Sequence, residues 1–103
     1  MYRNFMVKQI KTKAEFNRIT KVLKKNRMAY YMHTDIENDV ILERDGNYYK
    51  LGVRKGEKNI ATDLKTLISE GLTLWVPIGN YKYRPTRRYD ICKELGFKLE
   101  GEA

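Results

Sequence analysis

The run LTLWVPI at positions 72–78 is apolar along almost its whole length. A run of this length and composition is typical of an interior strand, with neighbouring strands on both sides. An interior strand requires a sheet around it, so the rest of the chain must supply its partners. Pro77 has no backbone N–H to donate, and it therefore predicts a bulge or an exit from the sheet near the end of the run.

The first third of the chain alternates strand and helix patterns. FMVKQI at 5–10 and AYYMH at 29–33 are rich in β-branched and aromatic residues and predict short strands. Between them, Thr12 and Glu15 have the spacing of a capping box, which predicts a helix that begins there and reaches about Arg27.

The remaining elements follow from turn residues and from helical spacing. Asp45-Gly46 lies between two β-rich segments and predicts a tight hairpin. A second helix should end at Gly71, which favours a left-handed cap, and a third should run from Pro85 or Thr86 to Gly96, before a last short strand. The apolar positions of the second helix are Ile60, Leu64, Leu67 and Ile68.

The resulting order is β-α-β-β-β-α-β-α-β within one domain, residues 1–103. This order predicts the α+β class, as a small αβ sandwich with mixed strand directions. The helix patterns and the apolar run together predict one core. Its members should be Phe16, Ile19, Leu23, Leu64, Leu67, Ile68, Leu74, Val76 and Leu95.

Positive charge is the strongest feature of the composition. The chain has 21 Lys and Arg against 13 Asp and Glu, a formal net charge of +8. Such a charge attracts phosphate groups, although a surplus of lysine can also be only solvated surface. The charge is segregated, with eight basic residues and one acid at 8–27 but five acids and one base at 35–45. The first helix should therefore present a basic face.

Several classes of protein are disfavoured. One cysteine, Cys92, and one histidine, His33, allow neither an internal disulfide nor a Cys/His metal cluster, and nothing suggests another metal site. No apolar run approaches the roughly 20 residues of a membrane span, and the first ten residues lack the apolar core of a signal peptide. These features predict a cytoplasmic protein that does not enter a membrane.

A glycine-containing loop lies between the hairpin and the second helix. A strand that passes through such a loop into a helix start presents free backbone amides, which can hold a pyrophosphate. Lys55 and Lys58 beside Gly56 add positive charge, although one glycine in a basic loop is also a common turn.

The segments VRKGEKNIATDLKTLISEG, LTLWVPIGN and ICKELGFKLEGE resemble the C-terminal half of the GNAT N-acetyltransferases, over about residues 40–102. In that family a loop of the form Arg/Gln-x-x-Gly-x-Gly/Ala holds the pyrophosphate of acetyl-CoA. Here Gly56 falls at the Arg/Gln position and Asn59 at the first glycine, while Ala61 matches the last position. Asn80 resembles the asparagine at the strand end, and the family's closing Leu-Gly-Phe matches 95–97.

The resemblance implies a truncated GNAT-like fold that binds acetyl-CoA or another acyl-CoA. The residues implied for the cofactor are Val53, Lys55, Gly56, Lys58, Asn59, Ile60, Ala61 and Asn80. Cys92 stands where many members have the tyrosine that protonates the CoA thiolate, and Tyr89 lies one turn earlier as a substitute. A cysteine on the apolar side of a helix is more typical of a core, so the resemblance favours binding over acetyl transfer.

The segment YKYRPTRRY at 81–89 supports a different class, a basic module without enzymatic activity. Tyrosines interleaved with cations can stack on bases and contact phosphates, as single-stranded nucleic-acid binders require. A host protein is another possible partner, and the small size is also typical of a phage-encoded protein. A tyrosine-rich loop over the sheet edge, or a regulatory protein with a vestigial loop, are the further alternatives. The anion-binding candidates are Tyr81, Lys82, Tyr83, Arg84, Arg87 and Arg88.

Overall fold

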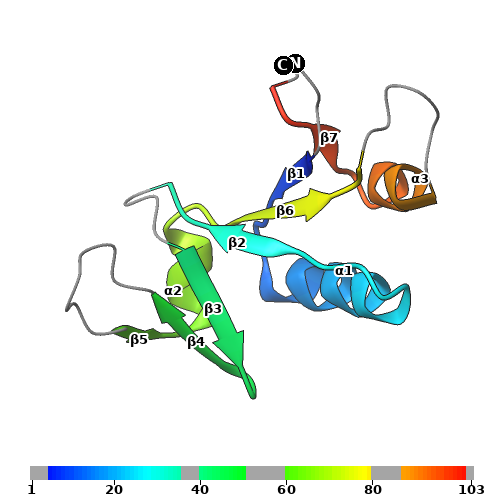
Figure 1. The fold of residues 1–103 in the computed structure, drawn as a ribbon. Helices are drawn as coiled ribbons and strands as arrows, with labels where there is room; N and C mark the ends of the chain where they lie inside the picture. The colour runs from blue at the N-terminus through cyan, green and yellow to red at the C-terminus, as the bar shows by residue number, and fades with distance from the viewer. Residues whose placement is uncertain (1–4, 36–39, 51–59, 80–86, 102–103) are drawn as a thin grey trace.

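The computed structural model describes residues 5–35, 40–50, 60–79 and 87–101, which contain seven strands and three helices (Figure 1). The strands are β1 (Phe5–Gln9), β2 (Tyr31–His33), β3 (Val40–Arg44), β4 (Asn47–Lys50), β5 (Ile60–Thr62), β6 (Thr73–Pro77) and β7 (Lys98–Leu99). The helices are α1 (Lys13–Lys25), α2 (Leu64–Ser69) and α3 (Arg87–Glu94). The predicted α+β class is confirmed.

All seven strands form one sheet in the order β5-β4-β3-β2-β6-β1-β7, and every neighbouring pair is antiparallel. β6, the predicted interior strand, lies between β1 and β2 (Figure 1). The predicted mixture of strand directions is wrong. β1 and β2 are joined through a helix and both run antiparallel to β6, so they are parallel to each other. β6 lies between them, however, so these two parallel strands are not hydrogen-bonded to each other.

β5 is a strand that the sequence did not predict. Residues 60–62 pair with β4 at the sheet edge, and the Ile60 side chain is 65% exposed. The prediction that Ile60 begins the second helix is therefore wrong. α2 begins after Asp63, whose Oδ1 accepts a hydrogen bond from the Thr66 backbone N–H at 2.8 Å. This N-cap hydrogen bond also lowers the pKa of Asp63.

The local signals for α1 and for the hairpin are confirmed. The Glu15 backbone N–H donates to Thr12 Oγ1 at 3.1 Å, and Glu15 Oε1 accepts from the Lys11 backbone N–H at 2.9 Å. At the turn between β3 and β4, Asp45 and Gly46 have φ angles of 52° and 81°. Two successive positive φ angles are what a two-residue hairpin of this type requires.

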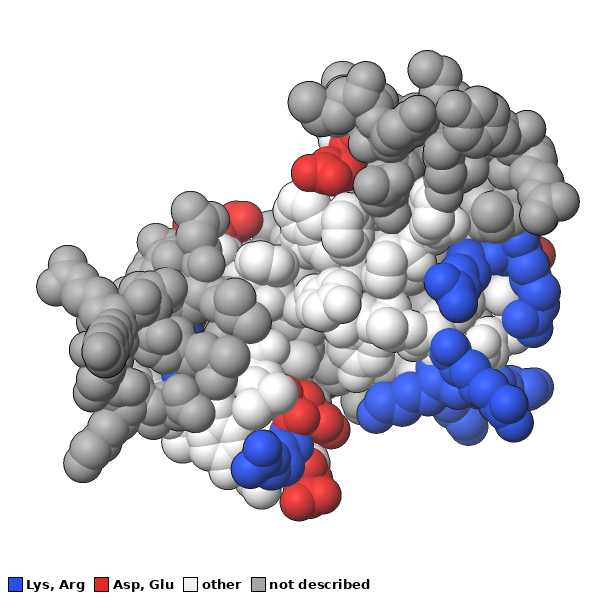
Figure 2. Space-filling model, in the orientation of Figure 1, with Lys and Arg blue, Asp and Glu red and all other residues white. Residues whose placement is uncertain are grey.

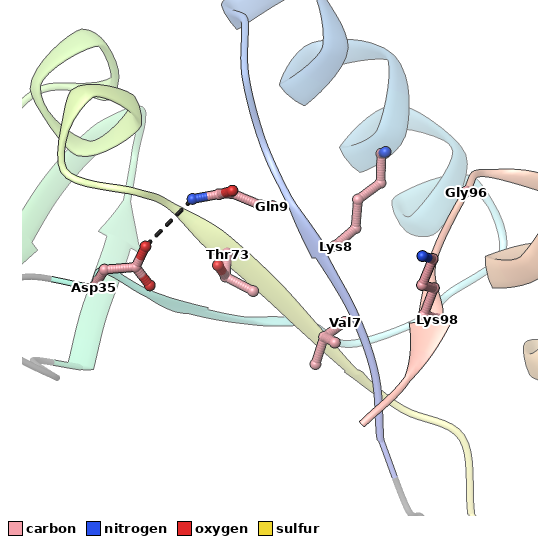
Figure 3. A pocket seen from close by; sticks show the side chains of 7 residues that line it. All are labelled: Val7, Lys8, Gln9, Asp35, Thr73, Gly96 and Lys98. Carbon is pink, nitrogen blue, oxygen red and sulfur yellow. Dashed lines mark hydrogen bonds between the residues drawn. The ribbon is translucent and has the colours of Figure 1, made fainter. Parts of the chain in front are cut away.

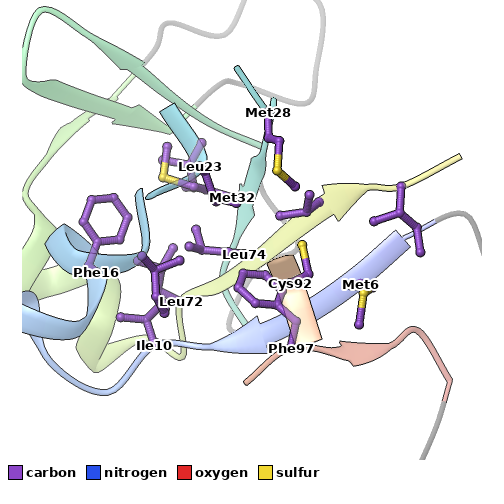
Figure 4. Packing of buried hydrophobic residues seen from close by; sticks show 14 of the residues in the cluster. Met6, Ile10, Phe16, Leu23, Met28, Met32, Leu72, Leu74, Cys92 and Phe97 are labelled. Atoms are coloured by element: carbon purple, nitrogen blue, oxygen red, sulfur yellow. The ribbon is translucent and has the colours of Figure 1, made fainter. Parts of the chain in front are cut away.

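The core lies between one face of the sheet and the three helices (Figure 4). Met6 is paired with Val76, and Met32 with Leu74, so these four buried side chains share a face. The same cluster contains buried residues of all three helices, which therefore cover this face, and no helix of the described residues covers the other face. The helical members are Phe16, Ile19, Leu23, Leu67 and Cys92.

The predicted core is confirmed in most of its members. Six of the nine predicted residues are buried: Phe16, Ile19, Leu23, Leu67, Leu74 and Val76. Leu64, Ile68 and Leu95 are partly buried and pack against that cluster. The basic face of α1 is also confirmed, since Lys13, Arg18, Lys21, Lys24 and Lys25 are all exposed.

Candidate functional site

Four ring-bearing side chains gather on the open face of the sheet, the face opposite the three described helices. Side chains of a strand alternate between the two faces, so residues between the core positions of β1, β2 and β6 point to the open face. We call these four residues the aromatic cluster: Phe5, Tyr31, His33 and Trp75. They come from three adjacent strands and are therefore neighbours although the chain separates them widely.

The rings of the aromatic cluster contact one another. The Phe5 ring centroid lies 5.9 Å from that of Trp75 and 6.4 Å from that of Tyr31, both in edge-to-face geometry. The His33 and Trp75 centroids are 5.5 Å apart. Tyr31 is 53% exposed, whereas the other three side chains are partly buried. Exposed aromatic surface that is held in place by its neighbours can receive a planar ligand without further ordering.

A basic surface lies beside this open face. It consists of the cations at the C-terminal end of α1 and at the start of α3, all of them exposed: Lys24, Lys25, Arg27, Arg87 and Arg88. The Arg87 guanidinium donates a hydrogen bond to Asn26 Oδ1, which joins the two helix ends. Figure 2 shows lysine and arginine side chains gathered over these ends of α1 and α3, next to an uncharged region over β2 and β6.

A pocket of about 440 Å³ lies at the β1 and β7 side of the sheet (Figure 3). Lys8, Lys98 and Asp35 are its charged residues, and the Asp35 carboxylate accepts a hydrogen bond from Gln9 at 3.3 Å. Lys8 is also 3.6 Å from the Glu15 carboxylate. Because carboxylates offset much of the lysine charge, this pocket does not select a phosphate by charge alone. Its remaining lining residues are Val7, Gln9, Thr73 and Gly96.

Most residues that the resemblance implies for acetyl-CoA lie outside the described ranges: Val53, Lys55, Gly56, Lys58, Asn59 and Asn80. Ile60 and Ala61 are described, and both belong to the edge strand β5. Ala61 is paired with Tyr49 of β4. α3 ends at Glu94 and Gly96 follows with a φ angle of 94°, so the predicted end of the third helix at Gly96 is confirmed.

The structure separates the two catalytic candidates by burial. Cys92 is fully buried in the core, and burial raises the pKa of its thiol to about 11. This confirms the interpretation of Cys92 as a core residue. Tyr89 is partly buried on the same helix, and the Lys93 ammonium lies 6.0 Å from its ring centroid.

Of the residues predicted to contact an anion, Arg87 and Arg88 are described, and both lie exposed in the first turn of α3. The other four candidates lie outside the described ranges: Tyr81, Lys82, Tyr83 and Arg84.

The aromatic cluster was not predicted from the sequence. The available signal was the alternation within 72–78, where Leu74 and Val76 face the core and Trp75 must face away.

Within the described ranges no group of three or more His, Cys, Asp or Glu residues could hold a metal ion. Over the same ranges no helix has the length and apolar character needed to cross a membrane. Comparison of the chain with protein-family models, with curated proteins and with solved structures finds no match. The aromatic cluster and the basic surface are therefore the features of the described residues that indicate a function.

Proposed function

We propose that this chain binds single-stranded nucleic acid on the open face of its sheet. The observation that carries the proposal is an aromatic cluster on an uncovered sheet face, with a basic surface beside it. Bases of a single strand stack on aromatic side chains, while phosphates are held by Lys and Arg. A sheet that presents aromatic residues on its free face is a common solution for binding unpaired bases.

The aromatic cluster and the basic surface bind different parts of the strand, the bases and the phosphates. Tyr31 is the most exposed ring of the cluster and offers a stacking surface, and the Phe5 ring contacts both it and the Trp75 ring. The basic surface attracts the backbone without regard to sequence, because counterions are released when phosphates are neutralised. Arg87 and Arg88 also lie at the N-terminus of α3, where cations oppose the helix dipole by about 0.3–1 kcal/mol each. This cost supports a role in binding an anion.

Acetyl-CoA binding is the alternative, and it is the function that the GNAT resemblance implies. Leu95-Gly96-Phe97, which matches the family's closing tripeptide, is the feature within the described ranges on which this alternative rests. The two functions predict different ligands for the same sample. Calorimetry tests both functions on one sample, which is titrated with acetyl-CoA and, at two salt concentrations, with single-stranded RNA and DNA. The proposed function requires that the single strands bind and that their affinity falls as the salt concentration rises.

Replacement of Tyr31 by alanine should weaken single-strand binding. Loss of one stacked base costs about 1–3 kcal/mol, which is about 5- to 150-fold in Kd. The measurement is fluorescence anisotropy with a labelled, mixed-sequence single-stranded RNA decamer. Ile60→Ala is the matched control, because Ile60 is the other large exposed apolar side chain of the described residues but lies on β5, at the far edge of the sheet. Equal affinity in the parent and in Tyr31→Ala would contradict the proposed binding face.

The double variant Arg87→Gln/Arg88→Gln should bind the same decamer more weakly and with less salt dependence. Each lost phosphate contact on a single strand lowers the slope of log K against log salt by about 0.7. The free energy of unfolding should stay about the same, because removal of two cations from a helix N-terminus offsets the loss of the exposed hydrogen bond from Arg87 to Asn26.

Lys13→Gln/Lys65→Gln is the control for this change in net charge, since both side chains are exposed and lie away from the basic surface. Its salt slope should stay closer to that of the parent. If the arginine variant unfolds more easily while its affinity and salt slope stay unchanged, then Arg87 and Arg88 have a structural role only.

A further inference from the structure

β2 and β3 separate after a short stretch of pairing. Met32 is paired with Ile41, and His33 with Val40, and the register ends there. Beyond this point β2 continues against β6 and β3 continues against β4. Figure 1 shows β3 turning away from β2. A cleft of about 370 Å³ opens between the two strands, next to Tyr31 of the aromatic cluster.

Both faces of the sheet contribute to the lining of this cleft. By strand alternation Tyr31 and Leu42 are on the open face, while Tyr30 and Glu43 are on the side of the helices. Because one cleft is lined by residues of both faces, a flat group that enters it between Tyr31 and Leu42 has Glu43 at the far side of the same cavity. The remaining lining residues are Met32 and Ile41, which are buried and apolar.

Glu43 is the one charged residue of the cleft. Its side chain is partly buried, and among the described residues no other side chain forms a hydrogen bond or an ion pair with it. Burial and the nearby Glu43 charge together raise the pKa of Tyr30 to about 12. An ionised carboxylate only accepts hydrogen bonds, and in a partly buried site it favours a ligand with matching donors.

We infer that this cleft receives one guanine base of the bound strand, with the Glu43 carboxylate accepting from the guanine N1–H and N2–H groups. The inference rests on the proposed function, because the base arrives with a strand that lies on the aromatic cluster. Guanine presents two adjacent donors on its Watson–Crick edge, which fit the two oxygens of one carboxylate.

The other bases fit Glu43 less well. Uracil and thymine place carbonyl oxygens on both sides of their single N3–H donor, so a carboxylate opposite that edge meets two acceptors. Adenine and cytosine offer one amino group beside a ring nitrogen that is itself an acceptor. The tyrosine and leucine walls contact any base alike, so the carboxylate decides the choice.

The test compares two labelled RNA decamers by fluorescence anisotropy: decauridylate, and the same strand with one central guanosine. The parent protein should bind the guanosine strand about tenfold or more tightly. Glu43→Gln should lose this preference while its affinity for decauridylate stays the same or increases. A strand with inosine, which keeps N1–H but lacks the 2-amino group, should fall between the two. Glu94→Gln, on exposed α3 surface, is the matched control and should keep the preference.

The possible results distinguish a wrong guanine assignment from a wrong proposed function. If the parent binds both strands equally, or binds decauridylate more tightly, the guanine assignment is wrong although single-strand binding stands. A preference that survives in Glu43→Gln would also overturn it. If neither strand binds, both the proposed function and the pocket are wrong.

Discussion

Leu67→Ala should lower the free energy of unfolding by about 2–5 kcal/mol. Leu67 is fully buried, and its carbonyl accepts a hydrogen bond from the Leu72 backbone N–H at 3.1 Å. α2 has six residues, and a helix this short is not stable alone. The packing of Leu67 in the core therefore holds α2 on the sheet. Truncation leaves a cavity that the surrounding core fills only in part.

Urea denaturation followed by circular dichroism measures this change. Lys65→Ala is the control on the same helix, and because Lys65 is exposed the change should stay within about 0.5 kcal/mol. A loss for Leu67→Ala as small as that of the control would mean that α2 does not pack on the sheet through this side chain.

Cys92 should react with a thiol reagent at least about 100-fold more slowly in the folded protein than in the unfolded chain at pH 8. The reactive species is the thiolate, and burial raises the pKa of Cys92 from 9.0 to about 11. Because the folded-state pKa is the higher one, folding keeps the thiol protonated and lowers the thiolate fraction by about two powers of ten. Burial of the sulfur in the core slows the reaction further.

The comparison uses 5,5′-dithiobis(2-nitrobenzoic acid), with and without guanidinium chloride, followed by absorbance. Cys92→Ala supplies the background, since it is the chain's one cysteine. Rapid reaction of the folded protein would contradict the core position of Cys92 and would return it to the catalytic candidates. Slow reaction leaves Tyr89 as the candidate to test for any acyl transfer.

The sequence predicted those parts of the fold that depend on near neighbours. The capping box at Thr12 and Glu15 depends on hydrogen bonds between residues at most four positions apart. The hairpin depends on its two turn residues, Asp45 and Gly46. Helical spacing likewise identified the buried positions of α1. β5 was missed because three residues at a sheet edge carry little pattern of their own, and their pairing with β4 decides their conformation.

The candidate site was predicted only in part. Arg87 and Arg88 were recognised as exposed cations because their position near a helix start could be read from the chain. Trp75 was not recognised, because its run is apolar on both faces and was interpreted as buried on both, although the predicted core positions Leu74 and Val76 place Trp75 on the opposite face. His33 was not recognised as part of the cluster either, because only the pairing of β2 with β6 brings it against the Trp75 ring.

The sequence by itself determined the α+β class, most of the core and the excess of positive charge. The tertiary structure alone decided that β6 inserts between β1 and β2, that β2 and β3 separate beside Glu43, and that the ends of α1 and α3 meet. The physical reason is the range of the interactions. Caps, turns and helical faces depend on residues a few positions apart, whereas strand order and surface clusters depend on free energies of contact between segments that only the complete fold brings together.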